Sequence, residues 1–64
     1  MKVKELLKVL YPNQPIRILS CISYIDTDVC FKQADRIRPF LNYKVDRISV
    51  TGNGVLRIEV KDNE

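Results

Sequence analysis

The last third of the chain contains two segments in which apolar and polar residues alternate with a period of two. This is the pattern of a β-strand with one buried face. The first segment has its apolar residues at Ile48 and Val50, and the second has them at Leu56, Ile58 and Val60. Two such segments joined by a short glycine-containing stretch predict an antiparallel β-hairpin.

The length of the loop decides which residues pair across this hairpin. The dipeptide Asn53-Gly54 is typical of a two-residue turn, but that register would place Val50 opposite the charged Arg57. A three-residue loop places Val50 opposite Leu56 and keeps the apolar side chains on one face. Because a shift of one residue moves every side chain to the other face, we expect the three-residue loop, with Gly54 as the left-handed residue of a bulge.

Apolar spacing and turn residues in the rest of the chain predict two helices and two further strands. The elements expected in chain order are a helix over residues 3–10, a strand over 16–25, a short strand over 29–32 and a short helix over 36–41 with Asp35 as its N-cap. Val45 is out of phase with the strand that follows it, which indicates a bulge near Asp46-Arg47. This order predicts one α+β domain over residues 1–64, with an antiparallel sheet of about four strands built from two hairpins and the helices on one face.

The residue types that the chain lacks restrict its chemistry. It has no histidine and two isolated cysteines, Cys21 and Cys30, so it lacks the ligand set of a zinc site and the commonest general base. We expect both cysteines to be free thiols that fill the core, and we expect a non-enzymatic protein without a cofactor. The first residues lack signal-peptide character and no segment is long enough to span a bilayer, which favours a cytoplasmic protein without a membrane partner.

Positive charge is concentrated in one segment. The chain holds eleven lysines and arginines against eight aspartates and glutamates, a net charge of +3. Residues 32–47 hold five of the basic and two of the acidic residues. The rest of the chain holds six basic and six acidic residues, so its charges cancel. Arginine suits bidentate contacts with phosphate or carboxylate groups, and tyrosine supplies an aromatic contact. The candidate binding residues are therefore Lys32, Arg36, Arg38, Tyr43, Lys44 and Arg47, although the same charges also suit a solvated surface.

Two further patterns each allow two interpretations. Asp26 and Asp28 have a spacing that suits Mg²⁺, but aspartates also form turns through their own side chains, and we expect a turn and no metal. The predicted strand over residues 16–25 carries apolar residues on both faces. Either the helices cover its second face or a second copy of the chain does. Both interpretations stay open, and a homo-oligomer is an expected form of the protein.

Three parts of the chain together resemble a known kind of protein. They are the opening Met1-Lys2-Val3-Lys4-Glu5-Leu6-Leu7, the segment Ala34 to Leu41, and the closing hairpin of Lys44 to Val50 and Val55 to Val60. This layout is similar to that of the small uncharacterised accessory proteins encoded by phages and prophages of Gram-positive bacteria. The resemblance implies a binding protein that antagonises a host defence factor, with a host protein or a nucleotide ligand as its partner. The alternative is a small nucleic-acid-binding regulatory domain that uses the basic residues 32–47.

Overall fold

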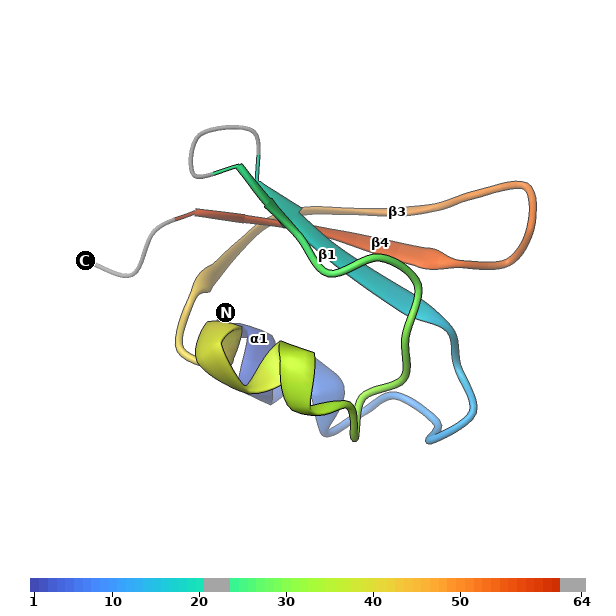
Figure 1. Ribbon diagram of the computed structural model, residues 1–64, viewed down its shortest axis with the longest axis horizontal. Helices are drawn as coiled ribbons and strands as arrows, with labels where there is room; N and C mark the ends of the chain where they lie inside the picture. The colour runs from blue at the N-terminus through green and yellow to red at the C-terminus, as the bar shows by residue number, and fades with distance from the viewer. Residues whose placement is uncertain (21–23, 62–64) are drawn as a thin grey trace.

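A computed structural model describes residues 1–20 and 24–61. Its elements, in chain order, are α1 (Val3–Leu7), β1 (Ile16–Ser20), β2 (Ile25–Asp26), the 3₁₀ helix η1 (Asp35–Phe40), β3 (Lys44–Val50) and β4 (Leu56–Lys61). The four strands form one sheet, and Figure 1 shows α1 and η1 together on one side of it. The expected α+β class, with the helices gathered on one face, is confirmed.

The strand order is β2-β1-β4-β3, and the two central strands, β1 and β4, run parallel. The prediction of a wholly antiparallel sheet is therefore wrong, and the sheet is mixed. Each hairpin is antiparallel within itself, but the hairpins join through strands that point the same way. From β2 the chain passes along the helical side of the sheet through η1 and enters the far edge as β3, so that β4 returns beside β1 (Figure 1).

The C-terminal hairpin has the register predicted from its alternation. Both predicted cross-strand pairs are present, Val50 with Leu56 and Ile48 with Ile58. The Thr51 amide donates to the Val55 carbonyl at 2.9 Å and closes a three-residue loop. Gly54 has a φ of 80°, which is the left-handed conformation expected of it. The pairing shifts between Val45 and Arg47, so the predicted bulge is also confirmed.

The first hairpin differs from its prediction in where the strands lie. The first strand ends at Ser20, before the predicted end at residue 25, and the second strand is Ile25–Asp26 instead of residues 29–32. In the predicted second strand, Cys30 makes only an isolated bridge with Ile16, in which each amide donates to the other carbonyl at 2.8 Å.

A turn at Asp26-Thr27-Asp28 explains the difference. The Asp26 carboxylate accepts a hydrogen bond from the Asp28 amide at 2.9 Å, and Asp28 adopts a φ of 58°. A turn was predicted here, and this hydrogen bond confirms it. A left-handed residue interrupts the alternation of a strand, so the chain cannot continue as a regular strand into residues 29–32.

Both helices differ in detail from their predictions. The first helix ends at Leu7, and the chain continues in turns in which the Leu10 amide donates to the Leu7 carbonyl at 3.3 Å. The second begins after Ala34, so the N-cap predicted for Asp35 is wrong. The Asp35 carboxylate lies 3.4 Å from the Arg38 guanidinium instead. The Asp35 side chain is largely exposed beside this arginine.

A small apolar core fills the space between the helices and the sheet. Its buried members are Val3, Leu6, Leu7, Ile16, Ile18, Cys30, Ile37, Ile58 and Val60. Phe40 and Leu41 pack against them, so Ile37, Phe40 and Leu41 of the second helical segment all face the core. Cys30 is a buried free thiol, as predicted. Cys21 lies outside the described residues.

Candidate functional site

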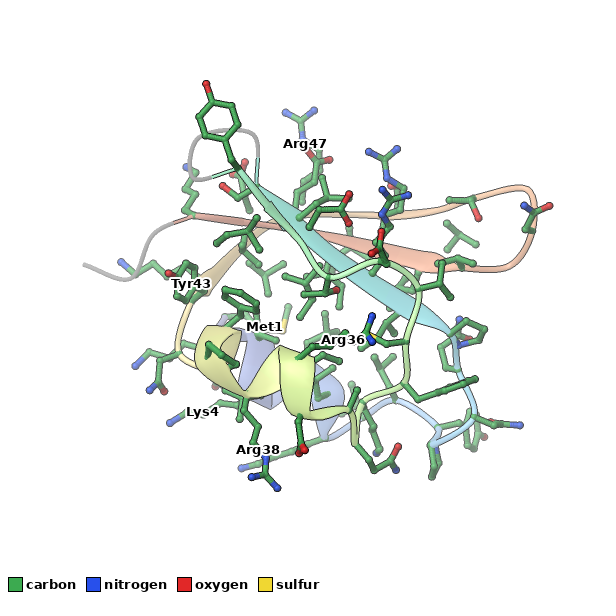
Figure 2. All side chains as sticks on the ribbon, in the orientation of Figure 1. Met1, Lys4, Arg36, Arg38, Tyr43 and Arg47 are labelled. Carbon is green, nitrogen blue, oxygen red and sulfur yellow. The ribbon has the colours of Figure 1, made fainter. Side chains whose placement is uncertain are left out.

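One face of the sheet points away from both helices. Because Ile16, Ile18 and Ile58 are buried on the helical side, the residues that alternate with them project from the opposite side. We call this opposite side the outer face. Its members are Arg17, Leu19, Asp26, Lys44, Arg47, Ser49, Arg57, Glu59 and Lys61. Figure 2 shows Arg47 on this side and Arg38 on the helical side.

Two arginines are neighbours at the centre of the outer face. Arg17 of β1 is in register with Arg57 of β4, and Ser49 of β3 is the partner of Arg57 on its other side. Adjacent strands lie about 4.8 Å apart. The side chains of Arg17 and Arg57 therefore extend from neighbouring positions on the same face of the sheet. Like charges directly opposite each other destabilise a sheet. A negatively charged group bound over this position would remove the repulsion.

The two arginines differ in their partners. The Arg17 Nε and Nη2 atoms donate to the two carboxylate oxygens of Asp26 at 2.9 and 2.6 Å. Arg57 is exposed, and no carboxylate of residues 1–20 or 24–61 lies within ion-pair distance of it. Arg57 is therefore the uncompensated cation of the pair. A shallow hollow of about 430 Å³, which both arginines help to line, lies beside them.

The carboxylate of Asp26 is engaged by the protein itself. The hydrogen bonds from Arg17, together with the one from the Asp28 amide, lower the pKa of Asp26 from 3.8 to about 2. The same ion pair raises the pKa of Arg17. Both oxygens of Asp26 thus have partners, and the described part of the chain has no cluster of three side chains able to ligate a metal.

The protein is expected to lose stability in acid, because protonation of Asp26 removes its ion pair with Arg17. The pKa of Asp26 is lower in the folded protein than the ordinary value of 3.8, so its contribution is complete above that pH and is lost as the pH falls towards 2. The variant Asp26→Asn should therefore unfold at lower urea concentration than wild type at neutral pH. The difference between the two midpoints should shrink steadily below pH 3.8. A difference that is independent of pH would show that the Asp26 charge does not contribute.

Two of the residues predicted to bind a ligand hold the fold together. The Lys32 ammonium donates to the carbonyls of Leu7 and Leu10, at 3.2 and 2.7 Å, where the first helical segment ends. The Arg36 guanidinium donates to the Thr27 carbonyl at 3.1 Å and links the second helix to the turn that follows β2.

The other four predicted residues lie on different sides of the molecule (Figure 2). Arg38 is exposed beside Asp35 on the helical side. Tyr43 is half-buried against the core, with its ring centre 5.4 Å from that of Phe40 in an edge-to-face contact. Lys44 and Arg47 belong to the outer face. The structure therefore does not bring the six predicted residues onto one surface.

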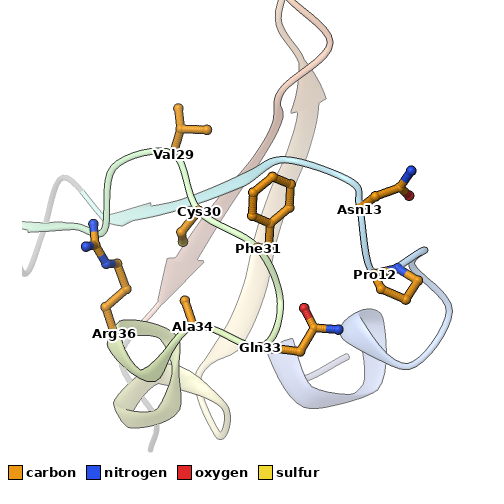
Figure 3. Close-up of a pocket in the computed structure, with 8 residues that line it drawn as sticks. All are labelled: Pro12, Asn13, Val29, Cys30, Phe31, Gln33, Ala34 and Arg36. Atoms are coloured by element: carbon orange, nitrogen blue, oxygen red, sulfur yellow. The ribbon is translucent and has the colours of Figure 1, made fainter.

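A second hollow, of about 690 Å³, opens on the helical side (Figure 3). Its lining comes from the connector after α1, from the chain around Cys30, and from the start of the second helix. Val29 and Phe31, which line it, are about half exposed. Arg36 reaches this hollow, but its guanidinium already contacts the Thr27 carbonyl.

Sequence reasoning did not select Arg17 and Arg57. A signal for each was present, because Arg17 lies between Ile16 and Ile18, and Arg57 lies between Leu56 and Ile58. Their proximity depends on the parallel pairing of β1 with β4, which the sequence pattern did not reveal.

Comparison of the chain with models of known protein families, with characterised proteins and with solved structures finds no match. The fold and the outer face therefore define it only as a small α+β protein with an open, basic sheet surface. Among the described residues, no helix has the length and apolar character needed to cross a bilayer.

Proposed function

We propose that this chain is a non-enzymatic binding protein whose ligand carries phosphate groups and lies on the outer face. The observation that carries the proposal is the position of Arg57. It is exposed, has no carboxylate partner in the described part of the chain, and lies directly beside Arg17. Guanidinium groups match the spacing of phosphate oxygens and bind them through two parallel hydrogen bonds.

The balance of charge on the outer face supports an anionic ligand. Asp26 compensates Arg17, and Asp46 compensates Lys61 at a distance of 3.3 Å. The remaining basic side chains of this face have no ion-pair partner among residues 1–20 and 24–61; they are Lys44, Arg47 and Arg57. Glu59 also lies on this face, in register with Arg47, so the basic residues of the face remain in excess. These cations lie on the two neighbouring strands β3 and β4, so a ligand with more than one phosphate suits the face.

Two kinds of phosphate ligand fit the expectations from the sequence. An accessory protein of the phage type, in the cytoplasm of a bacterial host, would antagonise a host factor by sequestering a nucleotide messenger. A small regulatory domain would instead cover a single-stranded nucleic acid. Both ligands present phosphate oxygens to the same arginines, and they differ in how many phosphates are contacted.

The test compares two substitutions that change the net charge equally. Arg57→Glu alters the outer face, and Arg38→Glu alters an exposed arginine on the helical side. Binding of a fluorescent single-stranded oligonucleotide and of a fluorescent nucleotide is measured by anisotropy. We expect Arg57→Glu to weaken binding about tenfold or more, because a hydrogen bond to a charged group contributes about 1.5–3 kcal/mol. Arg38→Glu should change affinity by less than about twofold, as expected of a distant screened charge.

Salt dependence distinguishes the two ligands. For a single-stranded oligonucleotide, the logarithm of the binding constant falls with the logarithm of salt by about 0.7 per phosphate contact. Arg57→Glu should therefore also reduce this slope. Binding of the nucleotide alone would identify the messenger type of ligand. An equal loss in both variants, or a greater loss in Arg38→Glu, would contradict the outer-face site, and no binding of either probe would contradict the function.

A further inference from the structure

The strand β3 is an edge of the sheet, and only its first residues are covered. The Val45 amide donates to the Met1 carbonyl at 2.8 Å, and the Val3 amide donates to the Tyr43 carbonyl at 2.9 Å. The N-terminal residues thus pair with the beginning of this edge. The bulge at Asp46-Arg47 then separates the covered part from the rest.

The rest of the edge presents unpaired backbone groups. In an antiparallel pair, every second residue turns its amide and carbonyl away from its partner strand. Because Thr51 hydrogen-bonds to Val55 across the hairpin, the outward-facing residues of β3 are Val50 and Ile48. Within residues 1–20 and 24–61 their outward groups have no hydrogen-bond partner. Their side chains are also exposed, by 67% for Val50 and 41% for Ile48.

We propose that this edge pairs with the same edge of a second copy of the chain, antiparallel and around a two-fold axis at Ser49. In this arrangement Ile48 lies opposite Val50 of the second copy, and Val50 lies opposite Ile48 of the second copy. Each of these pairs exchanges two backbone hydrogen bonds. The apolar side chains that are exposed in one chain then cover one another on the helical side of the sheet.

The alternative registers are less favourable. An axis at Ile48 would place Val50 opposite Asp46 of the second copy, next to the bulge. An axis at Val50 would place Ile48 opposite Gly52 of the second copy, in the loop. Only the axis at Ser49 gives two apolar pairs, and edge pairing between other residues is blocked by the bulge and the N-terminal segment.

The charges of β3 also agree with this register. On the outer face, Ser49 lies opposite Ser49 of the second copy, and Arg47 lies opposite Thr51 of the second copy. No two like charges therefore face each other directly, which avoids the repulsion expected of such pairs. The result is a continuous eight-stranded sheet, since each copy contributes four strands. The inference does not depend on the identity of the ligand on the outer face.

The interface is short, so association should depend on protein concentration, and a disulfide can trap it. Residues opposite each other in a pair without direct hydrogen bonds have Cα atoms about 4.5 Å apart, which a disulfide can bridge. Ser49→Cys should therefore form a covalent dimer under mild oxidation. In the control Arg47→Cys, the two introduced cysteines would be four residues out of register, or about 13 Å apart along the strands, and should not link.

The products are mapped by mass spectrometry, because Cys21 and Cys30 are also present. The expected result is a link between residues 49 of two chains in Ser49→Cys, at least several-fold above the Arg47→Cys link, and its loss when Val50→Lys is added. In sedimentation, wild type should become heavier with concentration, whereas Val50→Lys alone should stay monomeric. Circular dichroism checks that this variant is folded. Equal linking in both cysteine variants, or a wild type that stays monomeric at millimolar concentration, would overturn the proposal.

Discussion

Replacing Ile58 with alanine is expected to remove a large share of the stability of the protein. Ile58 is fully buried in β4 and lies between Ile18 of β1 and Ile48 of β3. Truncating a buried isoleucine to alanine costs about 2–5 kcal/mol. The total stability of a 64-residue chain is only about 3–10 kcal/mol, at about 0.05–0.15 kcal/mol per residue. Urea unfolding followed by circular dichroism would measure the loss directly.

The matched control is Ile48→Ala, which removes the same atoms from the adjacent strand. Ile48 remains 41% exposed in a single chain, so less apolar surface is returned to water on its truncation. We expect its unfolding free energy to fall by about 1 kcal/mol or less, measured at dilute concentration. Equal losses of unfolding free energy in the two variants would show that β4 is not the central strand.

Replacing Lys32 with methionine is expected to cost about 1.5–3 kcal/mol, the usual contribution of a hydrogen bond to a charged group. The Lys32 ammonium donates hydrogen bonds to the Leu7 and Leu10 carbonyls, which lie at the end of the first helix and in the turn that follows it. Cations also interact favourably with helix C-termini. Methionine retains an apolar chain of similar shape, so the variant removes chiefly the charge and its hydrogen bonds. The measurement is the midpoint of thermal or urea unfolding.

Lys8→Met is the control for this variant. Lys8 is exposed next to the same helix, and no ion pair or hydrogen bond to another described residue engages its side chain. Its replacement should change stability by no more than about 0.5 kcal/mol. If both lysine variants behaved alike, Lys32 would be a solvated charge, as the alternative interpretation of the basic segment holds.

The features that are determined by residues close together in the sequence were predictable from it. The register of the β3–β4 hairpin followed from the alternation of Ile48, Val50, Leu56 and Ile58, and the bulge followed from the phase of Val45. The parallel pairing of β1 with β4 was not predictable in this way. Alternation shows which face of a strand is buried, but it does not show which strand lies beside it or in which direction that strand runs.

The candidate site was harder to predict than the fold. Residues 32–47 concentrate positive charge in the sequence, but the segment passes through a loop, a 3₁₀ helix and an edge strand. Its side chains consequently project to opposite sides of the molecule (Figure 2). A count of charges along the chain gives the number of cations in a segment. A binding surface depends in addition on the direction in which each side chain projects. Arg17 and Arg57 become neighbours only through a contact between distant strands.

The parallel pairing of the central strands also bears on the order in which the protein folds. Ile16 pairs with Leu56, which lies far from it along the sequence, whereas the β3–β4 hairpin closes through a short loop. Contacts between distant residues form slowly, because the intervening chain must lose its freedom first. The hairpin should therefore form first, and the apolar side chains of β1 remain without their sheet partner until β4 is complete.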